Sequence, residues 1–185
     1  MIYETGISLA SVPTYVALLR GINLAAKRRV AMADLRAWLA ELGYADVRTL
    51  LQSGNAVFRT AKRPAAVRRE VEARLAAGAG FSIDCVVRTA DELRAVVDAD
   101  PLGSVADNGS RYLVSFLDRA AVAPAFAPDA FAPELFHVGP NEVYFWVPDG
   151  IQNSKVLAAF PTRKGEVATV RNWNTVTKLL TMTEA

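Results

Sequence analysis

Strand and helix patterns alternate along residues 14–88 in an order that few folds can accommodate. Short apolar runs predict strands, and apolar residues that recur at helical spacing predict helices. The expected strands cover 15–19, 46–51, 56–59 and 82–88, and the expected helices cover 32–42 and a segment that begins at Pro64. This order, β-α-β-β-α-β, is the ferredoxin-like arrangement.

Turn and capping residues agree with this order. Gly43 follows the first helical pattern, where a residue with positive φ commonly ends a helix. Gly54 and Asn55 suit a hairpin turn between the second and third strands. Thr89 and Glu92 have the spacing of a capping box, so a short helix is expected after the fourth strand.

The second half of the chain repeats the same order loosely. After a connection at 98–110, the expected strands are 111–117, 135–138, 143–147 and 167–170, with a short helix at 154–160. Pro124, Pro128 and Pro133 rule out one long helix between the first two of these strands. A closing helix follows, capped by Asn172 or Asn174. The repeat is one of topology, and the residues show no convincing similarity.

We therefore predict an α+β protein made of two packed ferredoxin-like (βαββαβ) subdomains plus a C-terminal helix. The expected boundaries are an N-terminal extension at 1–13, a first subdomain at 14–99 and a second subdomain at 110–185 that includes the C-terminal helix. A chain of 185 residues, of which 52% are hydrophobic, is large and apolar enough for such a core.

Composition excludes several classes of protein. The net charge of +2 is too small to require a polyanionic partner, so a basic site must be local. The single cysteine, Cys85, lies in an apolar segment and is expected to be buried and unreactive, so neither a disulfide nor a cysteine-based metal site is expected. No metal site of another kind is expected either, because Asp, Glu and His form no cluster with metal-ligand spacing. Because the start lacks a signal-peptide pattern and no apolar run approaches the ~20 residues that span a bilayer, we expect a cytoplasmic protein without membrane contact.

Donor and basic side chains gather in two separate motifs. The sequence RGINLAAKRR (20–29) joins the first strand to the first helix, and QSGN (52–55) forms the central turn. Because the first and third strands are neighbours in the ferredoxin-like fold, the two motifs should lie side by side. The ligand-binding candidates among them are Arg20, Gly21, Asn23, Lys27, Arg28, Gln52, Ser53 and Asn55.

The residue types of this edge suit an anion. They offer donors and positive charge but no carboxylate and no imidazole, and a loop that enters a helix adds free backbone N–H groups. The alternative is a structural role, in which Asn23 bonds to the loop backbone while Lys27 and Arg28 form a solvated turn.

Residues near the C-terminus allow the same two interpretations. The further candidates for ligand binding are Lys155, Arg171, Asn172, Trp173 and Asn174, because an indole beside basic residues at a helix start is a platform for stacking a base. The alternative is that the asparagines cap the helix and Trp173 packs in the core. No catalytic residue can be named, since the only histidine, His137, is expected to be a partly buried strand residue.

The segment Tyr15–Phe58 resembles a bacterial family known as domain-of-unknown-function family 1697. The matching residues are Leu18 to Asn23, Lys27, Met32, Leu35, Arg36, Leu42, Gly43, Gln52 to Asn55, Ser154, Lys155 and Arg171 to Val176. The resemblance covers nearly all of the chain from residue 14, and it implies a ferredoxin-like α+β fold but no activity. This sequence has Ala25 and Ala26 where the family tends to have glycines, and alanine impairs close approach of a backbone to phosphate. It also has Arg28 where the family often has asparagine, which adds charge.

We expect the protein to bind a nucleotide, a phosphate or RNA at the edge formed by the two motifs, without a cofactor. Two alternatives remain open. One is a metal-free enzyme of phosphoryl or acyl transfer, in which Lys27, Arg20 and Asn55 stabilise developing negative charge. The other is a protein-interaction module that uses an open sheet edge. The sequence does not determine the oligomeric state.

Overall fold

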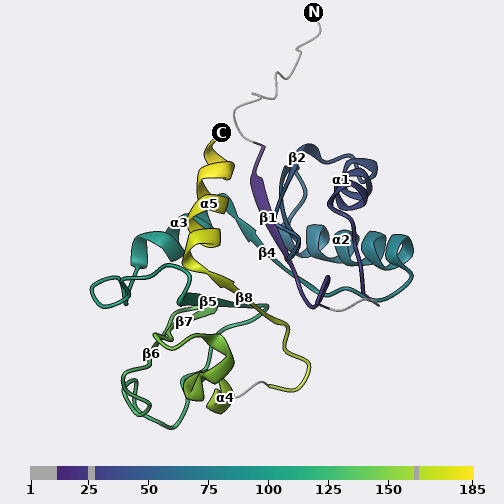
Figure 1. The fold of residues 1–185 in the computed structure, drawn as a ribbon. Coiled ribbons are helices and arrows are strands. Elements are labelled where there is room, and N and C mark those ends of the chain that lie inside the picture. The colour runs from purple at the N-terminus through teal and green to yellow at the C-terminus, as the bar shows by residue number, and fades with distance from the viewer. Residues whose placement is uncertain (1–11, 25–27, 161–162) are drawn as a thin grey trace, which may run out of the picture.

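The first four strands form an antiparallel sheet in the order β2-β3-β1-β4. The computed structural model describes residues 12–24, 28–160 and 163–185 (Figure 1). The elements of the first sheet and its two covering helices are β1 (Thr14–Leu19), α1 (Met32–Glu41), β2 (Ala45–Leu50), β3 (Asn55–Arg59), α2 (Pro64–Ala79) and β4 (Cys85–Thr89). This strand order is that of a ferredoxin-like unit.

The second sheet has the same antiparallel order, β6-β7-β5-β8. Its elements are β5 (Tyr112–Leu117), β6 (Leu135–Val138), β7 (Glu142–Trp146), the 3-10 helix η2 (Ile151–Asn153), α4 (Lys155–Ala159) and β8 (Ala168–Asn172). One difference separates it from the first sheet. Residues 118–134, all of which are described, form turns rather than a helix, as the prolines in this segment dictate.

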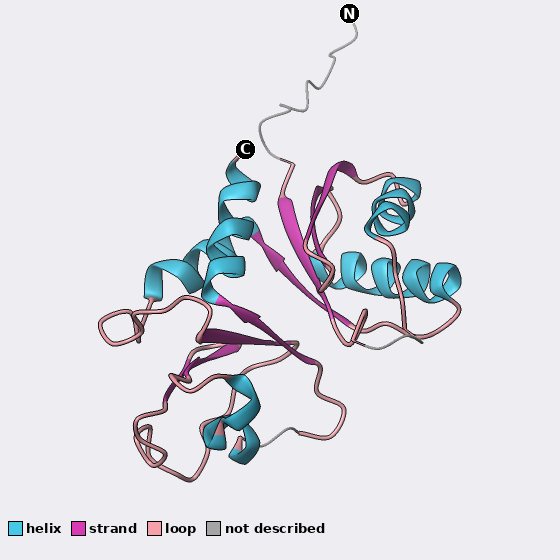
Figure 2. Ribbon diagram, in the orientation of Figure 1, coloured by secondary structure: helices cyan, strands magenta, loops and turns pink. Residues whose placement is uncertain are grey.

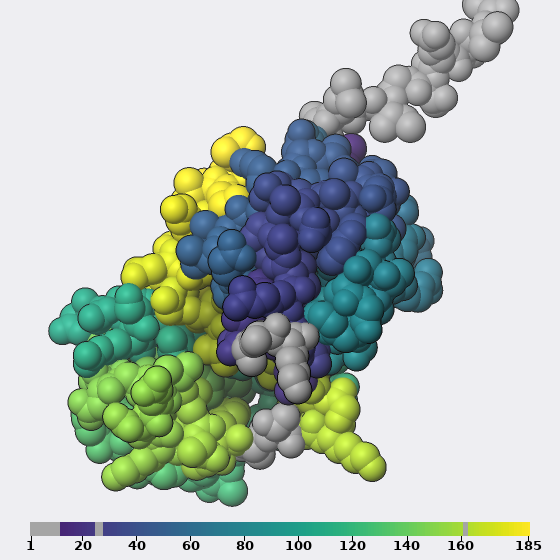
Figure 3. Space-filling view, turned by 45° about the vertical axis from the view of Figure 1, so that its right-hand side comes forward, coloured from purple at the N-terminus to yellow at the C-terminus, as the bar shows by residue number. Residues whose placement is uncertain are grey.

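One helix follows the last strand of each sheet, and both of these helices lie between the sheets (Figure 2). They are α3 (Ala90–Ala99) and α5 (Trp173–Glu184). Their apolar side chains join the inner faces of both sheets in one core, to which Val16 of β1, Leu93 of α3, Val114 of β5 and Val176 of α5 all belong. In the space-filling view, α5 surfaces in yellow along the boundary between the two halves of the chain (Figure 3).

The outer faces of the two sheets are covered very differently. Leu35 and Leu39 of α1 and Val71 of α2 pack on the outer face of the first sheet. Among the described residues, the outer face of the second sheet is covered by the five-residue α4, the turn segment 118–134 and side chains of the loop that follows α4. The second sheet is therefore less completely covered than the first.

The predicted fold class, two ferredoxin-like units with a C-terminal helix, is confirmed. The boundaries at 14–99 and 110–185 stay a prediction, because the core between the sheets is common to both halves. Except for Val12 and Pro13, the expected N-terminal extension lies outside the described residues. No helix in the described ranges is both long and apolar enough to cross a membrane.

Local signals set the ends of several helices. The predicted capping box is present, because Thr89 Oγ1 accepts from Glu92 N (3.1 Å) and Glu92 Oε2 accepts from Thr89 N (2.8 Å). Asn172 caps α5, with Oδ1 accepting from Thr175 N at 2.9 Å. His137 is exposed rather than partly buried, because β6 is the edge strand of its sheet.

The strand registers reveal an equivalence of residues that the sequence did not suggest. Val16 of β1 pairs with Arg88, and Val114 of β5 pairs with Arg171. Each arginine directly precedes the residue that caps the next helix, Thr89 for α3 and Asn172 for α5. The two halves are therefore related residue by residue around their last strands.

The central hairpin provides a test of this packing. Gly54 has a φ of +83°, and a Cβ built on it would lie 2.6 Å from Ile22 Cδ1 and 2.9 Å from Leu19 Cβ. Gly43 has a φ of +79° with no atom within 4 Å of such a Cβ. We expect Gly43→Ala to cost about 1–2 kcal/mol for the backbone conformation alone, and Gly54→Ala to cost about 1–3 kcal/mol more because of overpacking. Urea denaturation of both variants measures the difference, and equal losses would contradict the packing.

Candidate functional site

The two predicted loops lie side by side, as expected. Leu19 N donates to Gly54 O at 2.8 Å, and Asn23 Nδ2 donates to Gln52 O at 2.7 Å. The exit of β1 and the turn before β3 thus form one edge of the first sheet. The predicted convergence of the two motifs is confirmed.

Within this edge, Asn23 holds the loop together. Its Oδ1 accepts from Val30 N at 2.9 Å, and its Nδ2 donates to Val30 O at 3.0 Å as well as to the carbonyl of Gln52. Its φ of 54° and the φ of 64° at Gly21 turn the chain sharply after β1. The amide of Asn23 therefore serves the loop backbone, which is the structural alternative considered above.

Arg28 is also used internally. Its Nε donates to Gly21 O at 3.1 Å and its Nη2 to Ser82 O at 2.8 Å, and its guanidinium lies 4.8 Å from the centre of the Phe81 ring. Lys27 lies outside the described residues. The side chain of Gln52 is exposed at the turn.

Asn55 and Arg171 meet at the centre of the junction between the sheets. Asn55 is completely buried, and its Nδ2 donates to Leu50 O at 2.8 Å and to Ser53 Oγ at 3.1 Å. Its Oδ1 accepts from Arg171 Nε. The QSGN motif and the C-terminal motif, far apart in sequence, are therefore joined by a buried hydrogen bond.

The remaining N–H groups of Arg171 bond to neutral oxygens on both sheets. Nη2 donates to Leu19 O at 2.7 Å, to Ser53 O at 3.2 Å and to Gly54 O at 3.3 Å. Nη1 donates to Thr169 Oγ1 at 2.7 Å and to Val170 O at 2.8 Å. Among the described residues, no carboxylate bonds to this guanidinium.

Burial without a carboxylate partner destabilises the charged form of Arg171. Desolvation lowers the pKa of this side chain to about 10. The group still carries its charge at neutral pH, because six hydrogen bonds to oxygen atoms compensate for the lost water. Arg171 thus connects β8 to the ends of β1 and β3.

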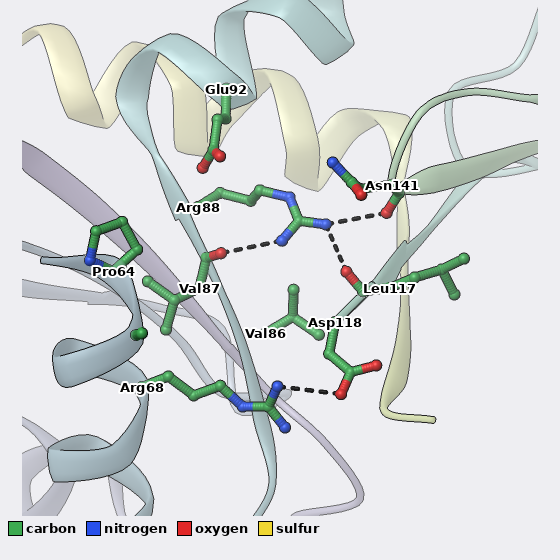
Figure 4. Close-up of a pocket in the computed structure, with 10 residues that line it drawn as sticks. Pro64, Arg68, Val86, Val87, Arg88, Glu92, Leu117, Asp118 and Asn141 are labelled. Atoms are coloured by element: carbon green, nitrogen blue, oxygen red, sulfur yellow. Dashed lines mark hydrogen bonds and ion pairs between the residues drawn. The ribbon is translucent and has the colours of Figure 1, made fainter. Parts of the chain in front are cut away.

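Arg88 makes the reciprocal connection from β4 to the second sheet (Figure 4). Its Nη2 donates to Leu117 O at 2.6 Å and to Asn141 O at 2.9 Å, and its Nη1 donates to Val87 O at 3.0 Å. Burial lowers its pKa. Leu117 and Asn141 occupy the positions in the second sheet that Leu19 and Gly54 occupy in the first.

The hollow beside Arg88 has a volume of about 310 Å³, but its charged groups already have partners. Arg68 Nη1 bonds to Asp118 Oδ2 at 3.1 Å, and Glu92 is occupied by the capping box. Figure 4 shows Arg68 bonded to Asp118, and Arg88 bonded to Val87, Leu117 and Asn141, around the hollow. This arrangement stabilises the junction and offers a ligand little free charge.

Arg20 is different, because its side chain is exposed and has no hydrogen-bond or ionic partner among the described residues. Only its backbone is fixed, with N donating to Asp84 O at 2.9 Å. Arg20 lines a cavity of about 290 Å³ on the outer face of the second sheet, together with Arg163 and Glu166. Arg163 and Glu166 form an ion pair, so Arg20 is the free cation of the described cavity wall.

The floor of this cavity contains one polar side chain that the sequence analysis missed. Ser115 of β5 is only 8% exposed, and its hydroxyl has no hydrogen-bond partner in the part of the chain that the structure describes. The rest of the floor is apolar and includes Phe145, and Leu157 and Phe160 add apolar side chains to the wall beside its charged residues. A single serine in an apolar strand gave no signal at the level of sequence.

The other C-terminal candidates lie elsewhere. Asn172 caps α5, Trp173 stacks on Tyr112 with ring centres 4.5 Å apart, and Asn174 Nδ2 donates to Ser110 Oγ at 3.2 Å. These contacts stabilise the start of α5. Of the C-terminal motif, Arg171 is the residue that the structure bonds to the edge between the loops.

Lys155 begins α4 and has an exposed side chain. Its backbone N donates to Glu134 Oε1 at 3.0 Å, and Glu134 Oε2 also accepts from Ser154 Oγ at 2.6 Å and Val156 N at 3.1 Å. Burial by itself would raise the pKa of Glu134, but these hydrogen bonds together hold it below its ordinary value of 4.5. The carboxylate of Glu134 therefore caps α4.

Comparisons with known proteins support the fold and give no activity. A family model described as "Protein of unknown function (DUF1697)" matches residues 12–144. No curated protein matches the chain. The chain is similar to the solved structure of the conserved bacterial protein SP0830 from Streptococcus pneumoniae, with a TM-score of 0.71 and 21% sequence identity over 94% of this chain and 99% of that one. At this identity, the likeness shows the fold alone.

We predict that Arg171→Met lowers the free energy of unfolding by about 3 kcal/mol or more, because several buried oxygens lose their donor. The free energy of unfolding of Arg171→Lys should lie between those of the wild type and Arg171→Met, since an ammonium group cannot reach all of these acceptors. Arg36 is an exposed control that bonds to Thr49 Oγ1 at 2.7 Å, and Arg36→Met should cost no more than about 0.5 kcal/mol. If Arg171→Met and Arg36→Met lose similar amounts of unfolding free energy in chemical denaturation, Arg171 does not stabilise the junction.

Glu134 predicts a pH dependence of stability. The pKa of Glu134 is lower in the folded state than in the unfolded state. Its contribution to stability is therefore present above pH 4.5 and is lost as the pH falls through the folded pKa. Glu134→Gln should therefore cost about 1–2 kcal/mol near neutral pH and little at about pH 2. Thermal unfolding across this range checks the prediction, with Glu184→Gln as the control because Glu184 pairs with Arg94 at the surface. A constant loss at all pH values would contradict it.

Proposed function

Because the chain belongs to the DUF1697 family, a family of proteins of unknown function, we propose its function from the site alone: it binds a small organic anion at the exit of β1. Arg20 contacts the acidic group of this ligand, and the cavity on the second sheet receives the rest. A carboxylate or a phosphate satisfies the donors that a guanidinium presents.

One observation carries the proposal. Arg20 has an exposed side chain without a partner among the described residues, and it lies at the rim of a cavity large enough for a small molecule. A guanidinium that lies beside an apolar cavity, and that forms no ion pair with the described residues, is suited to recognise an anion.

The other predicted residues hold in place the backbone from which the Arg20 side chain extends. Asn23, Arg28, Asn55 and Arg171 bond to the backbone and side chains of the two loops and so fix the exit of β1. A rigid support reduces the entropy that is lost when a ligand is bound. We therefore assign binding to Arg20 and positioning to the buried network.

The same cavity favours binding over catalysis. Glu166 is the one carboxylate among its described lining residues, and hydrogen bonds from Arg163, which outweigh the effect of burial, lower the pKa of Glu166. A general base near neutral pH needs a higher pKa and free access to the substrate. The buried Cys85 fits a reducing compartment such as the cytoplasm, where we place this function.

We expect Arg20→Ala to weaken binding of the best anion by about tenfold or more, the effect of losing one charge-assisted hydrogen bond. Arg29 is the matched control, because it is exposed in the same loop and does not line the cavity. Isothermal titration with inorganic phosphate, AMP and octanoate measures the effect. Equal affinities in Arg20→Ala and Arg29→Ala would refute the proposal.

An RNA partner would give a different result. Binding of a single-stranded oligonucleotide would fall steeply with salt and would respond to Arg20 and Arg29 alike. A small anion held by Arg20 should show a much weaker dependence on salt. The titrations are therefore repeated at two salt concentrations.

A further inference from the structure

We propose that the ligand of this cavity is an amphipathic organic acid, whose apolar body lies on the outer face of the second sheet and carries a polar substituent that hydrogen-bonds to Ser115. This inference rests on the proposed function, which assigns the acidic group to Arg20. It adds the chemical class of the remainder of the ligand.

The outer faces of the two sheets are equivalent residue by residue. The strand registers relate six residues of the first sheet to six of the second. Those of the first sheet are Ala17, Leu19, Ala56, Phe58, Cys85 and Val87. Their counterparts are Ser115, Leu117, Val143, Phe145, Ala168 and Val170, and all of these line the cavity. The cavity floor is thus the surface that α1 and α2 cover in the other half.

The two equivalent faces differ in how completely the chain covers them. On the first sheet, Leu35, Leu39 and Leu75 fill the space over these residues, so that Ala17 and Phe58 are fully buried. On the second sheet, Val143 and Phe145 are nearly as buried as their counterparts, but Ala168 and Val170 are half-buried, and the described residues that cover them leave a cavity of about 290 Å³. An apolar surface of this kind is favourable to cover, and a ligand with an apolar body covers it as the two helices do.

The described floor of the cavity has one polar position. Ser115 stands where the first sheet has Ala17, and it is 8% exposed. Its hydroxyl finds no acceptor or donor among the described residues. Because this hydroxyl opens on the cavity, it is free to bond to a ligand there, whereas alanine at the equivalent position has no hydrogen-bonding group. A hydroxyl or carbonyl group on the ligand satisfies Ser115 and makes the site selective.

The charges at the rim define the other end of the ligand. Arg163 Nη2 donates to Ala120 O at 2.6 Å and is paired with Glu166, so this pair contributes no net charge. Arg20 adds one positive charge. A monoanion with an apolar body matches this distribution better than inorganic phosphate, which would leave the floor uncovered.

The test compares acids that share a carboxylate and differ in their body. Acetate, octanoate and octanoates that carry a hydroxyl at successive chain positions are titrated into the full chain. We expect octanoate to bind at least about tenfold more tightly than acetate, because each buried methylene contributes to affinity. We expect at least one hydroxylated acid to bind more tightly than octanoate.

Three variants locate these effects. Ser115→Ala should weaken the best hydroxylated acid by about fivefold to tenfold and leave octanoate within about twofold. Ala168→Leu fills the floor and should weaken octanoate about tenfold without affecting acetate. Val122 is 56% exposed at the rim, so Val122→Asp tests the same site at a position where the fold tolerates substitution, and it should weaken octanoate.

The outcomes separate this inference from the proposed function. If Arg20→Ala weakens acetate and octanoate while octanoate binds no better than acetate, the anion site stands and the amphipathic ligand is refuted. If octanoate is preferred but Ser115→Ala changes nothing for any hydroxylated acid, the assignment of the polar substituent is refuted. If Arg20→Ala and Arg29→Ala behave alike for every acid, the proposed function itself fails.

Discussion

The structure depends on a buried guanidinium. Arg171 donates from β8 into the carbonyl groups of Leu19, Ser53 and Gly54 at the ends of β1 and β3. Its charge has left water without a carboxylate partner among the described residues, so the side chain is stable only where many oxygens converge on it. This requirement fixes the position of one sheet relative to the other and of the two loops relative to each other.

The same interaction occurs twice in opposite directions. Arg88 and Arg171 occupy equivalent strand positions, and each bonds to the end of the first strand of the other sheet. The residue after that strand is Asp118 in one case and Arg20 in the other. Asp118 pairs with Arg68, whereas Arg20 has no such partner in the described chain. A nearly symmetric junction thereby becomes chemically asymmetric, and Arg20 is the free charge that results.

The candidate site could be predicted only in part. That RGIN and QSGN lie together followed from the strand order, because the first and third strands of this fold are neighbours. The role of their donors did not follow. In the sequence, an asparagine or arginine looks the same whether its side chain bonds to a ligand or to a backbone carbonyl. The carbonyl of Leu19 that Arg171 reaches lies 152 residues away along the chain. Ser115 gave no signal, because only its equivalence to Ala17 makes it unusual.

The sequence by itself determined the two ferredoxin-like units, the helix cap at Thr89, the choice of Asn172 or Asn174 as the cap of the closing helix, and the absence of one long helix between the first two strands of the second half. These depend on periodicity, on hydrogen bonds within a few residues and on the rigid ring of proline, all of which are local. Only the tertiary structure decided which polar side chains hydrogen-bond within the protein and which remain available to a ligand. That outcome is set by burial and by acceptors from distant strands, so Asn55 and Arg171 became internal supports while Arg20 was left facing a cavity.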